Sequence, residues 1–170
     1  NLVKLVFSTL QNTSYPIDIT GKTKVLNYYH KLANKNIKKA FHRNGSLNNN
    51  KSFFGPGSVA LQREDIIKDT KNNILKNYCV TDKADGERKF IFITEDTNYN
   101  VYLIDMNLEI QFTGLTVTNK TLYNTIIDGE HILSKIGGLN LFMAFDIYYL
   151  NNKKSPISKL KFYDPSNPQN

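Results

Sequence analysis

The residues from Lys83 to Arg88 have side chains and a spacing that could perform nucleophilic chemistry. They read Lys-Ala-Asp-Gly-Glu-Arg and lie between two apolar runs. Lysine is a weak nucleophile at neutral pH because its ordinary pKa is about 10.4, so a reactive lysine needs a desolvated pocket or neighbouring cations. Arg88 is the obvious local cation. The segment is therefore either a covalent catalytic element carried by Lys83 or a solvated turn whose charges keep it soluble.

A β-hairpin is the local structure that the pattern predicts for this segment. Asp85-Gly86 is a dipeptide typical of turns between strands, with one strand expected to end at Val80 and Thr81 and the other to return as residues 90–93. Lys83 would then lie at the mouth of the hairpin with a restricted reach. Cys79, the only cysteine, lies in the first of these strands and is interpreted as a small buried hydrophobic residue.

Other elements of the chain must hold this segment in place. From Thr23 onward, apolar residues recur at three- and four-residue intervals and predict a helix of about four turns. A second helix is expected from Asp65 to Asn77, whereas residues 2–10 could form a strand or a short helix. Short strands of an antiparallel meander are expected at residues 90–94, 101–105 and 109–112, followed by strands at 125–133 and 139–150.

Composition favours a folded domain with an anionic partner. The chain has 170 residues, of which 40% are hydrophobic, and a net charge of +7, which suits one domain that contacts RNA or a triphosphate. A single cysteine fits a reducing, intracellular compartment. No apolar stretch is long enough for a membrane span, and no glycine-rich phosphate loop is present, so side chains would have to hold any triphosphate.

Three segments resemble motifs of one family, the covalent nucleotidyltransferases, which contains ATP-dependent polynucleotide ligases and mRNA-capping guanylyltransferases. Residues 83–88 resemble its K-x-D-G-x-R signature. Residues 126–130, Ile-Ile-Asp-Gly-Glu, resemble its third motif, and residues 141–147 resemble the aromatic-aspartate strand that follows. All three occur in the family's order. Residues 78–88 and 54–61 are most similar to the capping enzymes of large nucleocytoplasmic DNA viruses.

The resemblance implies a role for each matching residue. Lys83 would attack the α-phosphorus of a nucleoside triphosphate, and Arg88 would contact ribose or phosphate. Glu130 would bind a ribose hydroxyl or water around Mg²⁺ or Mn²⁺, and Phe145 would stack on the purine. Asp82 could place backbone groups against the base, while Asp85 and Asp146 have supporting roles.

The same resemblance implies a fold, a function and partners. The expected fold is α+β, a partial nucleotidyltransferase domain of the ATP-grasp-like or DNA-ligase type with an antiparallel sheet and no OB-fold. Residues 1–50 would be a helical and linker segment, residues 51–164 the first part of the catalytic domain, and residues 165–170 a tail or truncation point. The expected function is transfer of GMP from GTP through Lys83 to a 5′-diphosphate RNA end, in the host cytoplasm or virion.

Two alternatives remain open from the sequence. One is an ATP-dependent ligase that uses the same lysine, and the other is a catalytically inactive module that binds RNA or a partner subunit. The family's later motifs, with a metal-binding carboxylate and paired lysines, have no counterpart among residues 148–170. We therefore expect a piece of a longer polypeptide or a decayed gene, inactive by itself, whose remaining parts could include triphosphatase and methyltransferase domains.

Overall fold

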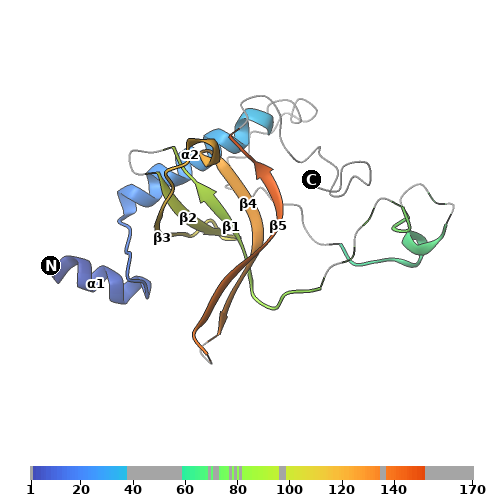
Figure 1. Ribbon diagram of the computed structural model, residues 1–170, viewed down its shortest axis with the longest axis horizontal. Helices are drawn as coiled ribbons and strands as arrows, with labels where there is room; N and C mark the ends of the chain where they lie inside the picture. The colour runs from blue at the N-terminus through green and yellow to red at the C-terminus, as the bar shows by residue number, and fades with distance from the viewer. Residues whose placement is uncertain are drawn as a thin grey trace.

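The computed structural model describes residues 2–37, 59–68, 70, 73–76, 78, 80, 82–95, 99–134 and 137–151. Two helices are followed by a five-stranded antiparallel sheet (Figure 1), which is the α+β arrangement expected from the sequence. The helices are α1 (Leu2–Gln11) and α2 (Ile19–Ile37). The strands are β1 (Glu87–Ile93), β2 (Asn100–Asp105), β3 (Ile110–Thr116), β4 (Thr125–Ser134) and β5 (Leu139–Tyr149). Short 3₁₀ turns, η1 (Arg63–Ile66) and η2 (Lys120–Leu122), complete the described elements.

The sheet has the strand order β3-β2-β1-β4-β5, with β1 at its centre. The predicted meander is confirmed for β1, β2 and β3, which pair with their neighbours in the chain. The chain then crosses to the other edge of β1, where β4 pairs with it along seven residues. This crossing places the end of the lysine segment beside β4.

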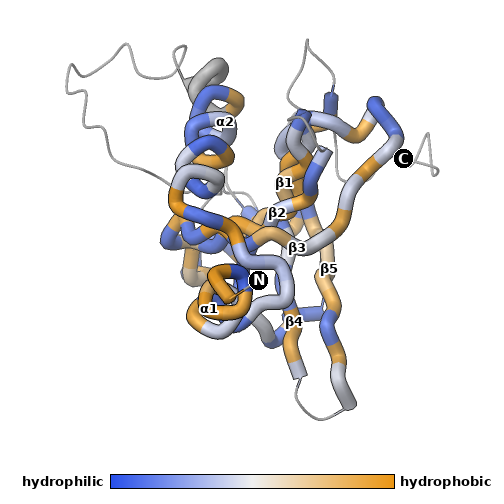
Figure 2. The backbone as a smooth tube through the Cα atoms, turned by 90° about the vertical axis from the view of Figure 1, so that its left-hand side faces the viewer, coloured by the Kyte–Doolittle hydropathy of each residue, from blue (hydrophilic) through white to orange (hydrophobic). Residues whose placement is uncertain are grey.

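Helix α2 covers one face of the sheet and supplies part of the main core, as Figure 2 shows. The predicted apolar stripe is confirmed, because Val25 and Tyr29 are buried and Tyr29 packs against Phe90 and Phe92 of β1. Asp18 accepts a hydrogen bond from the Gly21 amide at 2.6 Å and caps the first turn of the helix.

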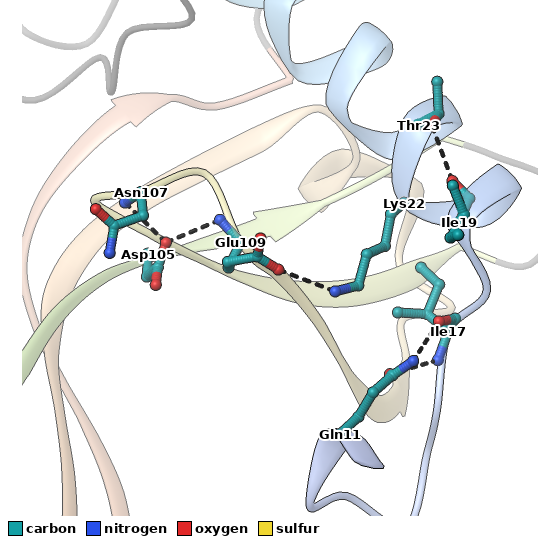
Figure 3. Close-up of polar contacts among 8 residues, drawn as sticks. All are labelled: Gln11, Ile17, Ile19, Lys22, Thr23, Asp105, Asn107 and Glu109. Atoms are coloured by element: carbon teal, nitrogen blue, oxygen red, sulfur yellow. Dashed lines mark hydrogen bonds and ion pairs between the residues drawn. The ribbon is translucent and has the colours of Figure 1, made fainter. Parts of the chain in front are cut away.

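Polar contacts fix the start of α2 against the sheet and against α1 (Figure 3). Lys22 of α2 forms an ion pair with Glu109, next to the β2–β3 turn, at 2.9 Å. The Gln11 side-chain amide donates to the Ile17 carbonyl oxygen at 2.7 Å and accepts from the Ile17 backbone N–H at 3.0 Å. Residues 2–10, which the sequence left open between strand and helix, belong to α1.

The helix expected from Asp65 to Asn77 is wrong. Among the described residues of this stretch, those of the 3₁₀ turn η1 are followed by residues that are not helical. The Asn73 side chain donates to the carbonyl groups of Lys68 and Thr70, and the Thr70 hydroxyl donates to that of Ile67. These side chains therefore bind carbonyl groups that a continuous helix would use.

The hairpin expected around Asp85-Gly86 is also wrong. Described residues 80 and 82–86 are not in a strand, and Val80 is fully exposed at 101%. Both edges of β1 are already occupied, by β2 and by β4, so no neighbouring position in the sheet is left for a preceding strand. Cys79, Thr81 and residues 45–50, the linker part of the segment expected over residues 1–50, lie outside the described residues. Within the described part of the chain, neither helix is both long and apolar enough to span a membrane.

Candidate active site

The pairing of β1 with β4 brings the lysine segment against the Asp128-Gly129-Glu130 motif. Arg88 lies opposite Glu130 in the ladder, and Glu87 lies opposite His131. The Glu130 Oε1 atom accepts a hydrogen bond from the backbone amide of Gly86 at 3.3 Å. Two segments that are far apart in the sequence are thus joined at the point where β1 begins.

Gly86 allows this close approach because it has no Cβ atom. A Cβ built at this position would lie 2.6 Å from the carbonyl oxygen of His131 and 3.1 Å from Cγ of Glu130. The first of these is a backbone atom, which cannot move aside as a side-chain tip can. The glycine of the Lys-Ala-Asp-Gly segment therefore has a packing role against β4 in addition to any role in a turn.

Arg88 forms a bidentate ion pair with the buried carboxylate of Asp128. The guanidinium Nε lies 3.1 Å from Oδ1, and Nη2 lies 2.6 Å from Oδ2. The Tyr148 hydroxyl donates to the same Oδ2 atom at 2.6 Å. Asp128 is 0% exposed, so these donors replace the water that a charged carboxylate would otherwise bind.

The same contacts shift two pKa values. The hydrogen bond from Arg88 to Asp128 raises the pKa of the Arg88 guanidinium, so Arg88 stays charged at every accessible pH. Burial, and then the hydrogen bond with Asp128, raise the pKa of the Tyr148 hydroxyl, which therefore stays protonated and acts as a donor.

A second polar network lies on the opposite face of β1. Lys89 Nζ is 3.0 Å from Glu87 Oε2 and 3.2 Å from Nδ1 of His131. An ammonium group can only donate, so this Nδ1 accepts and Nε2 carries the proton that is donated to Oδ1 of Asn140, 2.9 Å away. The hydrogen bond from Lys89 lowers the pKa of the Glu87 carboxyl. The network holds the first residues of β1, directly after Gly86, to β4 and β5.

Lys83 and Asp82 precede this anchored region. Both side chains are exposed, and residues 82–86 have no regular secondary structure. The Lys83 ammonium donates to the carbonyl group of Ala84 at 3.4 Å. Lys83 therefore lies in an irregular segment, and the last residue of this segment, Gly86, is hydrogen-bonded to Glu130.

Phe145 lies at an irregularity of β5. Asp146 pairs with Asp128 and Ala144 pairs with Gly129, so Phe145 is the extra residue of a β-bulge. Phe145 is 42% exposed. The bulge places this aromatic residue beside the Asp128-Gly129 segment.

The structure brings together some of the residues predicted for the site. Arg88 and Glu130 are cross-strand neighbours, and Phe145 lies on the adjacent strand, whereas Lys83 and Asp82 extend from the start of β1. Asp128 and Tyr148 were missed as members of the site. A sequence signal existed for Asp128, since an acidic residue after Ile126 and Ile127 in a buried strand requires partners, but nothing in the sequence singles out Tyr148.

Glu130 is the residue through which the site could contact a divalent cation. The described residues contain no group of three or more carboxylate, histidine or cysteine side chains that could hold an ion by themselves. Mg²⁺ is commonly held by one or two carboxylates together with substrate phosphates and water. The carboxylate of Glu130 fits this donor set, whereas that of Asp128 is occupied by Arg88 and Tyr148.

Comparison with known proteins agrees with the motifs. Residues 17–164 match the family described as mRNA capping enzyme, catalytic domain. A probable mRNA-capping enzyme of Acanthamoeba polyphaga mimivirus is 32% identical over 144 residues, which are 85% of this chain and 10% of the viral protein. The chain thus spans about a tenth of the length of this relative.

Proposed function

The chain belongs to the mRNA capping enzyme catalytic-domain family, and we propose that it carries the guanylyltransferase step of capping. In this proposal, GTP donates GMP to Lys83, and the GMP then passes to the 5′-diphosphate end of an RNA. The observation that carries the proposal is the hydrogen bond between Gly86 and Glu130. It joins the lysine segment to the acidic motif, as a single nucleotide site built from both would require.

The chemistry assigned to Lys83 is an in-line displacement at phosphorus. The neutral amine attacks the α-phosphorus, a P–N bond forms, the bond to the bridging oxygen breaks, and pyrophosphate leaves while the amine proton passes to solvent. A terminal phosphate oxygen of the RNA then attacks the same phosphorus, the P–N bond breaks, and the Lys83 nitrogen takes up a proton from solvent as it leaves. The first step needs a lysine that loses its proton readily, so nearby cations must lower its pKa.

The other residues would bind and orient the nucleotide. Arg88, held by Asp128, presents a planar guanidinium whose geometry suits ribose or phosphate oxygens. Phe145 offers an exposed aromatic face on which a purine could stack. A divalent cation, contacted through Glu130, would supply positive charge to the triphosphate.

An ATP-dependent ligase would use Lys83 in the same way but with AMP. The two functions are separated by incubating the full polypeptide that the gene encodes with labelled GTP or labelled ATP and Mg²⁺. We expect GTP to label the protein, and the label to move to RNA with a 5′-diphosphate end. Preferential labelling by ATP would favour the ligase, and absence of labelling by either nucleotide would favour the inactive binding module.

A further inference from the structure

We propose that Tyr148 is a positioning residue for nucleotide binding, which acts by holding the Asp128 carboxylate that in turn orients Arg88. The inference rests on the proposed function, because it assigns to Arg88 a contact with the bound nucleotide. Tyr148 lies outside the three motifs that resemble the nucleotidyltransferase family. Tyr148 is the residue before the last one of β5, and only the fold brings it to the site.

Tyr148 and Arg88 donate hydrogen bonds to the same oxygen atom of Asp128. Oδ2 of Asp128 accepts from both Nη2 of Arg88 and the hydroxyl of Tyr148, each at 2.6 Å. Two donors on one oxygen fix the plane of the carboxylate, and the carboxylate plane fixes the plane of the guanidinium fork. Removing the hydroxyl takes away one of these two donors to the buried oxygen and allows the Arg88–Asp128 pair to tilt.

Tyr148 is itself held rigidly. Its ring is buried, with 6% of the residue exposed, and packs edge-to-face on Phe90 with centroids 5.5 Å apart. Phe90 is fully buried beneath Tyr29 of α2. Packing in the main core therefore fixes the position of the Tyr148 hydroxyl. The hydroxyl in turn fixes the Asp128 carboxylate, which binds Arg88.

The orientation of the Arg88 guanidinium is the feature that a bound nucleotide would depend on. Arg88 lies opposite Glu130 in the β1–β4 ladder, and Glu130 is bound to Gly86. A guanidinium held at a fixed angle loses less conformational entropy when a ligand oxygen binds than one that must be ordered on binding. The hydroxyl of Tyr148 should therefore contribute to nucleotide affinity more than to the rate of the chemical step.

The test compares Tyr148→Phe, which keeps the ring on Phe90, with Tyr102→Phe as a matched control. Tyr102 is a buried tyrosine of the same core, and its hydroxyl contacts Asn100 on β2. In the full polypeptide that the gene encodes, we expect Tyr148→Phe to raise the KM for GTP in adduct formation about tenfold with less than about a threefold change in kcat, as for loss of one hydrogen bond to a charged group. Tyr102→Phe should leave both values within about twofold.

A double-mutant cycle shows whether the effect passes through the guanidinium. In an Arg88→Lys background, which keeps the charge but not the fork, Tyr148→Phe should change KM by less than about twofold. A tenfold effect that persists in this background would overturn the role assigned to Arg88. An unchanged KM in Tyr148→Phe would overturn the inference while leaving the guanylyltransferase proposal intact.

A spectroscopic measurement on residues 1–170 gives a readout that does not depend on activity. The Arg88 Nε–H proton should give a resolved NMR signal that exchanges slowly with water in the wild-type chain and in Tyr102→Phe. In Tyr148→Phe the signal should shift and exchange faster. A fast-exchanging signal in the wild-type chain would contradict the inference even if Tyr148→Phe failed to fold. Absence of any adduct in the wild-type polypeptide would instead overturn the proposed function, and with it the nucleotide role of Tyr148.

Discussion

Glu130 of β4 accepts a hydrogen bond from the backbone amide of Gly86 at 3.3 Å, immediately before β1 begins. This contact ties the segment that carries Lys83 to the acidic motif 44 residues later in the chain. Substituting Gly86 by alanine should break it, because the added Cβ would lie 2.6 Å from the His131 carbonyl oxygen.

We expect Gly86→Ala to lower the free energy of unfolding by about 1–3 kcal/mol, as for other overpacked sites, and to reduce adduct formation at Lys83. Urea unfolding of residues 1–170 measures the first effect. Gly138→Asn is a suitable control, since a Cβ there meets no atom within 4 Å and asparagine tolerates the positive φ of 63°. Equal stability of Gly86→Ala and the wild-type chain would show that β1 and β4 do not approach as described.

The stability of the chain at alkaline pH should depend on Tyr148. Its pKa is raised in the folded state from an ordinary value of 10.0, first by burial and then by Asp128. Tyrosine in the unfolded chain ionises near its ordinary pKa, so the contribution of Tyr148 is fully present below pH 10 and is lost as pH rises further. Between pH 10 and pH 11, the wild-type chain should lose up to about 1 kcal/mol more stability than Tyr148→Phe.

Denaturant unfolding at pH 8, 10 and 11 measures this difference. Tyr102→Phe, in which Tyr148 remains, should follow the wild-type chain. Parallel loss of stability in the wild-type chain and Tyr148→Phe would mean that the hydroxyl is not buried against a charged carboxylate.

The sheet was largely predictable because its strands are short runs rich in apolar and β-branched residues that polar stretches separate. Phe90 and Phe92 point into the core beneath α2, and the spacing of Val25 and Tyr29 marks the matching face of the helix. The errors arose where polar side chains compete with the backbone for hydrogen bonds, as around Asn73, and where a turn dipeptide was read without knowing the strand order. Asp85-Gly86 does not form a hairpin because β4, which comes much later in the chain, occupies the edge of β1.

The candidate site was predictable only in part for a similar reason. Motif residues such as Arg88 and Glu130 can be found by resemblance, but their pairing depends on the register between β1 and β4. Tyr148 has no sequence signal, because its contact with Asp128 follows from bulges in β5 that shift the register against β4.

Residues 1–170 by themselves should form no detectable GMP adduct. Within the described residues, Lys89 beside the lysine segment is paired with Glu87, and Asp128 balances the charge of Arg88, the proposed nucleotide contact. A triphosphate carries about four negative charges at neutral pH, and each missing charge-assisted contact costs on the order of 1.5–3 kcal/mol, so two or three missing contacts reduce the rate by several powers of ten.

The test is to incubate residues 1–170 and the full polypeptide that the gene encodes with labelled GTP and Mg²⁺. The amount of GMP adduct in each is then compared on a denaturing gel. A strong GMP-labelled band from residues 1–170 would show that phosphate-binding cations already lie within this chain. Lys153, Lys154, Lys159 and Lys161, all outside the described residues, would then be the first to substitute.

The covalent role of Lys83 is tested most directly by the adduct itself. In the full polypeptide, labelled GTP and Mg²⁺ should give a product that is labile in acid and stable in alkali, as expected of a phosphoramidate. Lys83→Ala should abolish it, and Lys83→Arg should do the same because a guanidinium stays protonated, while Lys76→Ala, an exposed lysine earlier in the chain, should keep it. The predicted result is that both Lys83 variants lose the adduct while Lys76→Ala keeps it. An adduct that survives in either Lys83 variant would contradict the account.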